Sequence, residues 1–196
     1  MTARNRGSFA GARAAATGWV VAALVAAGPL VAAEAAPSGY AWRSCTGMGA
    51  EVLVPDGWHF RDAPGDRADA CSFSLDPPSA DGRFETGVSL SLLRQVPERT
   101  GQTPSDFARG FLDKLAEKYR VRKRSSSSQP PFEAFRAEIE LADAQGKPLR
   151  LYQLAIANPM TGSVYLVAFR APASRYEAEW KRVERALEHL GLDLGV

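Results

Sequence analysis

The stretch from Leu149 to Leu190 reads LRLYQLAIANPMTGSVYLVAFRAPASRYEAEWKRVERALEHL and decides the expected fold. Two apolar runs, Leu149–Ala157 and Ser163–Phe169, flank the segment NPMTG. Asn-Pro and Thr-Gly are turn-forming pairs, and side chains alternate between the two faces of a strand. The pattern therefore predicts a β-hairpin. Both strands are apolar on both faces, so the sheet that contains them needs cover on both sides.

The apolar spacing changes after Phe169 from a period of two to a helical period. Apolar residues then follow at steps of four and three: Tyr176, Trp180, Val183, Leu187 and Leu190. Ser174 and Glu177 fit an S-x-x-E capping box, and Gly191 suits a helix stop. We expect an amphipathic helix across one face of the sheet. Its stripe is interpreted as core packing, with a catalytic role for Tyr176 or Trp180 as the alternative.

Three shorter segments upstream are expected to be strands. Glu51–Val54 ends at the turn Pro-Asp-Gly, and Cys71–Leu75 and Val88–Leu92 have alternating apolar residues, the last with an extension as far as Val96. In the third segment the apolar residues alternate with glycine and serine. A face of such small residues suits either a closely packed helix or a shallow cavity, and the sequence leaves both open.

A second amphipathic helix is predicted from Thr103, which serves as N-cap before Pro104. Phe107, Phe111, Leu115 and Tyr119 follow at steps of four. The serines Ser125–Ser128 are expected to form a solvated loop. Phe135–Leu141 then alternates apolar and charged residues, as in a half-exposed strand.

The order of these elements predicts an α+β fold, a three-layer α/β/α sandwich with a mostly antiparallel sheet. The segment VPDGW (54–58), the antiparallel run and the closing strand and helix over Val164–Leu190 resemble the PsbP-like family. The resemblance covers most of the mature chain. It implies the same α/β/α fold and non-enzymatic roles in binding or assembly. It implies no functional residues for this chain and no photosystem function.

The first 35 residues have the pattern of a secretory signal. Three arginines, Arg4, Arg6 and Arg13, precede the apolar stretch Trp19–Ala33, and Ala-Glu-Ala follows at 33–35. We expect residues 1–35 to be removed, with cleavage after Ala33 as the alternative, leaving one domain over 36–196. Because the apolar stretch is short and contains Gly-Pro, no transmembrane segment should remain after cleavage. An uncleaved membrane anchor is the other interpretation. The mature protein would be periplasmic or secreted.

Removal of the signal changes the charge balance of the chain. The whole chain has 24 basic and 22 acidic residues. Residues 1–35 hold three of the basic residues and one acid, Glu34, so the mature chain has 21 of each. A neutral mature chain gives no support for nucleic-acid binding.

The mature chain contains two cysteines, Cys45 and Cys71. In an exported protein an isolated pair is most simply a disulfide. A bridge between them would close a loop of about 25 residues and contribute on the order of 3 kcal/mol. A free reactive thiol and a metal ligand are the alternatives.

No motif assigns chemistry to a residue. The sequence has no G-x-S-x-G elbow, no phosphate-binding loop and no H-E-x-x-H pair, and the two histidines, His59 and His189, are interpreted as structural or surface residues. The acids Asp62, Asp66 and Asp69 lack the spacing of a calcium loop. We therefore assign no catalytic residue, metal or cofactor. The expected function is an exported binding or assembly module, with a carrier of a small apolar or amphipathic ligand, or an enzyme of unrecognised type, as alternatives.

The densest cluster of one charge sign is Arg120, Arg122, Lys123 and Arg124. If this segment is extended, the three arginines share one face and Val121 points inward. Guanidinium groups hold carboxylates and phosphates bidentately, so the cluster is a candidate contact for an envelope protein or an anionic surface. The alternative is a charged edge strand that discourages pairing between sheets.

Overall fold

The computed structural model describes residues 35–63, 69–79 and 82–195, and all of them belong to the unit Ala35–Val196. In this part of the chain the strands form two sheets in which all the recorded pairs are antiparallel. The predicted signal over residues 1–35 lies outside the described residues, except for Ala35.

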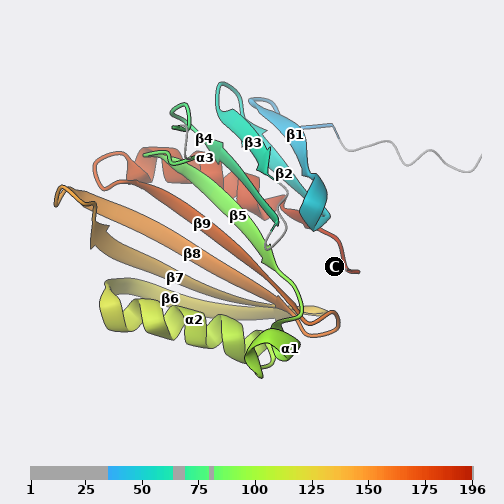
Figure 1. Cartoon of the computed structure of the whole chain (residues 1–196). Coiled ribbons are helices and arrows are strands. Elements are labelled where there is room, and N and C mark those ends of the chain that lie inside the picture. Colours follow the sequence, from blue (N-terminus) through green and yellow to red (C-terminus); the bar gives the residue numbers. More distant parts are fainter. Residues whose placement is uncertain (1–34, 64–68, 80–81, 196) are drawn as a thin grey trace, which may run out of the picture. The chain divides into compact units, whose positions relative to one another are not determined.

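The larger sheet has seven strands in the order β3-β4-β5-β9-β8-β7-β6 (Figure 1). These strands are β3 (His59–Ala63), β4 (Asp69–Ser74), β5 (Gly87–Leu93), β6 (Arg120–Gln129), β7 (Phe132–Ala142), β8 (Pro148–Asn158) and β9 (Ser163–Pro172). The predicted hairpin is confirmed as β8 and β9, which pair from Leu149 opposite Pro172 to Asn158 opposite Ser163. It lies inside the sheet, which explains why both of its faces are apolar.

The smaller sheet joins the two ends of the described chain. It has the order β1-β2-β10, formed by β1 (Tyr40–Cys45), β2 (Ala50–Pro55) and β10 (Gly191–Leu192), with a short 3₁₀ turn over Thr46–Met48. The strand β2 contains the predicted segment from Glu51 to Val54, whereas β1 and β10 were not predicted. Each of these two strands takes its backbone hydrogen bonds from β2. Their formation therefore depends on a distant segment, and the local sequence pattern does not predict them.

Helices cover the two faces of the larger sheet. The helix α2 (Pro104–Lys118) packs on β7 and β8, and α3 (Tyr176–Glu188) packs on the opposite face, between β9 and β2 of the smaller sheet. A single turn of helix, α1 (Val96–Thr100), precedes α2. The predicted α/β/α sandwich is confirmed, with the small sheet as an addition to the α3 layer (Figure 1).

Alternation along the central strands divides the core between the two faces. On β8, Leu154 and Ile156 lie in the core beneath α3, while Ala155 and Ala157 lie in the core beneath α2. The small alanines let α2 approach the sheet closely. Every residue of the predicted α3 stripe packs in or against the α3-side core, so its interpretation as core packing is confirmed.

Four local expectations were wrong. Gly191 does not stop α3, because the helix ends at Glu188 and Gly191 begins β10. Ser125–Ser128 form part of β6, because pairing with β7 supplies the backbone partners that a serine run does not favour by itself. Ser174 does not cap α3, whose N-cap is Arg175 without a side-chain bond, and Glu177 instead pairs with Arg150. Val96 begins α1 and does not extend the strand β5.

The predicted disulfide is present. Cys45 at the end of β1 and Cys71 in β4 are bonded, with their Cα atoms 5.8 Å apart, and both are buried. The bridge therefore ties the smaller sheet to the larger one. Within the ranges that the structure describes, the helices are too short or too polar to span a membrane.

Candidate functional site

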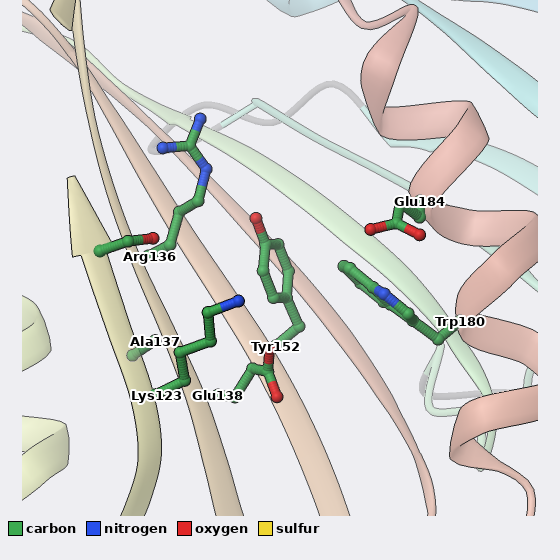
Figure 2. Close-up of a pocket in the computed structure, with 8 residues that line it drawn as sticks. Lys123, Arg136, Ala137, Glu138, Tyr152, Trp180 and Glu184 are labelled. Atoms are coloured by element: carbon green, nitrogen blue, oxygen red, sulfur yellow. The ribbon is translucent and has the colours of Figure 1, made fainter. Parts of the chain in front are cut away.

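A polar groove of about 320 Å³ lies between α3 and the strands β6, β7 and β8 (Figure 2). It forms where the sheet continues past the helix, so that side chains of β6 and β7 on this face remain uncovered. Its lining comes from both sides of this gap: Lys123, Ser125, Arg136, Ala137, Glu138, Tyr152, Trp180 and Glu184. We call it the α3 groove.

Two aromatic rings form the centre of the α3 groove. Tyr152 of β8 and Trp180 of α3 pack with ring centroids 4.5 Å apart and planes tilted by 47°. Trp180 also stacks on Tyr176, at 5.9 Å and 5°. Tyr176 is buried, whereas Tyr152 and Trp180 are half-buried. The core therefore supports one side of the Tyr152–Trp180 pair, and the exposed part of the two rings is available for contact with a ligand.

Charged groups of both signs surround the rings. Figure 2 shows Lys123 and Arg136 on the strand side of Tyr152, and Glu184 on the α3 side. Lys123 lies opposite Glu138 in the pairing of β6 with β7. Burial raises the pKa of the Tyr152 hydroxyl, and the nearby guanidinium of Arg136 acts in the opposite direction. The rings are therefore partly shielded from water while the charges around them stay accessible.

An arginine network fixes one wall of the groove. Arg150 of β8 is 9% exposed and pairs with Glu177 of α3 and, at 3.4 Å, with Glu138 of β7. Its guanidinium carbon lies 4.0 Å from the centroid of the Tyr176 ring. Contact with Arg150 lowers the pKa of Glu177. This network joins β7, β8 and α3, and it positions Glu138 at the groove.

The structure distributes the predicted basic cluster over both faces of the sheet. A β-bulge between Val121 and Lys123 shifts the register of β6. Arg120 and Arg122 consequently pair with Glu140, at 3.4 and 2.9 Å, while Arg124 pairs with Asp113 of α2 at 2.7 Å. The expectation that the three arginines share one face was wrong, and of the four residues Lys123 is the one that lines the α3 groove.

Neither histidine belongs to the groove. His59 is exposed on the edge strand β3, and His189 follows the last turn of α3, where its Nδ1 lies 3.0 Å from the carbonyl oxygen of Arg185. Among the described residues, no three histidine, cysteine, aspartate or glutamate side chains gather as a metal site.

No protein-family model matches the sequence, and no curated protein matches it. Among solved structures, cyanobacterial PsbP from Synechocystis sp. PCC 6803 is similar with a TM-score of 0.51 and 13% identity, over 85% of this chain and 100% of that chain. The chain has the PsbP-like fold. LpqN of Mycobacterium tuberculosis, described as involved in cell envelope biogenesis, is similar with a TM-score of 0.50 and 15% identity, over 73% of this chain and 82% of that chain. Identities at this level establish the fold alone.

Within this PsbP-like fold, sequence reasoning identified one residue of the groove, Lys123, as a candidate contact. It assigned Trp180 to the core and left Arg136, Glu138 and Glu184 as the polar side of a strand or helix. The sequence did place Arg136 and Glu138 on one face of β7, and Glu184 one turn after Trp180 on α3. These patterns indicate a shared site only when β7 and α3 are known to lie next to each other.

Proposed function

We propose that the chain is an exported, non-enzymatic binding module of the cell envelope that holds a segment of a partner protein in the α3 groove. Two features support export: the secretory pattern at residues 1–35 and the Cys45–Cys71 disulfide, which is typical of proteins in oxidising compartments. The description of LpqN as an envelope protein agrees with this location.

The observation that carries the proposal is the lining of the groove, where an aromatic pair lies between charges of both signs. Such a surface suits a peptide segment with an apolar side chain on Tyr152 and Trp180, an acidic side chain toward Lys123 and a basic one toward Glu184. An anionic membrane surface suits it less well, because Arg120, Arg122 and Arg124 already form ion pairs.

The same lining favours a protein segment over a small apolar ligand. Between α3 and the sheet the interior is filled by buried side chains such as Val167, Phe169 and Val183. The groove itself exposes charged and hydroxyl groups, whereas sites for small apolar ligands are lined mainly by apolar side chains.

The test is site-specific crosslinking in the native envelope. A photoreactive residue replaces Ser125 in the groove, and in a control it replaces Gln145, which is exposed in the turn between β7 and β8. We expect a discrete crosslinked partner from position 125 and none from 145. The crosslinked segment, made as a peptide, should bind the mature chain about ten-fold more weakly after Lys123→Glu or Glu184→Lys, since each reversal turns an attraction into a repulsion.

Lys114→Glu, an exposed charge reversal on α2, serves as the matched control and should leave binding unchanged. The proposal is wrong if positions 125 and 145 give the same crosslinks. It is equally wrong if the peptide binds all three variants like the parent chain.

A further inference from the structure

On the face of the larger sheet that carries α2, parts of β4, β5 and β9 lie beyond the helix, although Val164 and Leu166 of β9 pack beneath it. Ser72, Ser89 and Ala168 lie in one row across these strands. Ser89 alternates with Val88 and Leu90, which are buried in the α3-side core, so it points to the opposite face. The sequence left open whether these small residues pack under a helix or line a shallow cavity, and the structure places a cavity here.

The cavity has a volume of about 220 Å³ and is lined by Gly82, Arg83, Phe84, Ser89, Ala168 and Arg170. Arg170 of β9 is fixed in place, because it donates a hydrogen bond to the Phe84 carbonyl and its guanidinium carbon lies 5.2 Å from the Phe84 ring centroid. The side chain is therefore already oriented before any ligand arrives.

A third guanidinium reaches the same place from β3. A side-chain carbon added at Gly82 would lie 2.5 Å from Nη1 of Arg61, so that group rests against the rim of the cavity. Arg61, Arg83 and Arg170 thus converge from three separate segments around a floor of small residues that includes the Ser89 hydroxyl.

The surroundings of Arg170 disfavour its charged form. Burial lowers the pKa of Arg170, and the neighbouring guanidinium of Arg83 lowers it further, while Glu85 acts in the opposite direction. Core packing next to the cavity does not require arginines, since the neighbouring residues Val88, Leu90 and Phe169 are buried on the other face of the sheet. A bound anion would offset both the burial and the repulsion.

We propose that this cavity, the arginine cavity, binds the phosphate group of a small ligand. Guanidinium groups hold phosphate oxygens bidentately, and a tetrahedral oxyanion presents oxygens in several directions, as three converging arginines require. A planar carboxylate is satisfied by one guanidinium. The cavity is smaller than the roughly 300–1,000 Å³ of pockets for drug-sized ligands, so a phosphate with few attached atoms fits it.

The arginine cavity and the α3 groove lie on opposite faces of the sheet, so the two proposals can fail independently. The test is a titration of the ¹⁵N-labelled mature chain with inorganic phosphate, glycerol 3-phosphate and acetate at constant ionic strength. We expect saturable amide shifts at Gly82, Arg83 and Ser89 with both phosphates, and none of comparable affinity with acetate. A second experiment measures binding to vesicles that contain phosphatidic acid, and it distinguishes a lipid headgroup from a free phosphate ester as the ligand.

Arg83→Gln and Arg61→Gln should each weaken phosphate binding about ten-fold. Arg99→Gln, at an exposed arginine of α1, is the matched control and should change it less than two-fold. Arg170 is left intact, because it also holds Phe84.

If the protein binds only the vesicles, and Arg83→Gln loses that binding, the phosphate group recognised by the cavity belongs to a lipid. The proposal is overturned by the absence of saturable binding in both experiments, by equal binding of acetate, or by equal losses in all three variants.

Discussion

At the scale of single residues, Arg150 is the charged residue with the least exposure among those that the structure describes. It is nearly buried, yet it reaches carboxylates on β7 and α3 and the face of the Tyr176 ring. Removing one member of a buried ion pair leaves its partner without a counter-charge. The residue therefore matters for the α3 groove, whose wall includes Glu138.

Arg150→Met keeps the length of the side chain and removes its charge. We expect it to lower the free energy of unfolding by about 1–3 kcal/mol, because Glu138 loses its partner. Urea denaturation of the mature chain measures the change. Glu177→Gln is the control and should cost less, since the Glu177 side chain is 73% exposed. Equal losses in the two variants would contradict this account.

Tyr165 provides a test of pH dependence. It is fully buried, and its hydroxyl donates to the Met48 carbonyl at 3.0 Å. Burial raises the pKa of Tyr165, so the folded protein holds this proton more tightly than the unfolded chain does. The associated stability is complete below the unfolded pKa of about 10 and is lost as the pH rises toward the folded pKa.

We therefore expect the thermal midpoint to fall above a pH of about 10. Tyr165→Phe should lower stability at neutral pH by about 1 kcal/mol and make the alkaline decline shallower. Burial also raises the pKa of Tyr152 and Tyr176, so part of the decline should remain. Calorimetry across pH measures both effects. An unchanged slope in the variant would exclude Tyr165 as a source of the decline.

At the scale of secondary-structure elements, the disulfide joins β1 to β4 and so links the two sheets. Cys45→Ser with Cys71→Ser should lower the free energy of unfolding by about 3 kcal/mol, because the unfolded chain regains the freedom of the closed loop. Urea denaturation of the variant and of the reduced parent should agree. Thiol titration of the denatured, unreduced protein should find no free thiol in the mature chain, and two free thiols would refute the bridge.

The strand β6 occupies an edge of the larger sheet, and nearly all of its residues are exposed. Arginine and lysine side chains and the β-bulge are typical means of preventing such an edge from pairing with another chain. We expect Arg120→Val with Arg122→Val to promote association, detected by sedimentation velocity. Lys114→Val with Lys118→Val on α2 adds the same apolar area away from the edge and should not. If the β6 variant sediments as the parent protein does, the two arginines do not protect this edge from association.

At the scale of the whole molecule, we predict that about the first 35 residues are removed during export, from the arginine-flanked apolar stretch and the Ala-Glu-Ala site. Mass spectrometry of protein recovered from its native envelope measures the mature N-terminus. The recovered protein should begin at Ala36, or at Glu34 if cleavage follows Ala33. An N-terminus still at Met1 would exclude cleavage and favour the membrane-anchor interpretation.

Local patterns in the sequence determined the central hairpin, both long helices, the covered sheet and the cysteine pair. Each of these depends on neighbouring residues: the spacing of apolar side chains, the turn chemistry of Asn-Pro and Thr-Gly, or the count of cysteines in an exported chain. The α3 stripe from Tyr176 to Leu190 was readable for the same reason, since its period of 3.6 is present within one segment.

Tertiary structure alone decided the placement of the serines and of the functional surfaces. Ser125–Ser128 form a strand because their backbone groups pair with β7. The bulge in β6 places Arg124 on the opposite face of the sheet from Arg120 and Arg122. The α3 groove and the arginine cavity each bring together side chains from segments far apart in the chain. Such convergence depends on strand order and register, which arise from the packing of the complete sheet against its helices and leave no period in the local sequence.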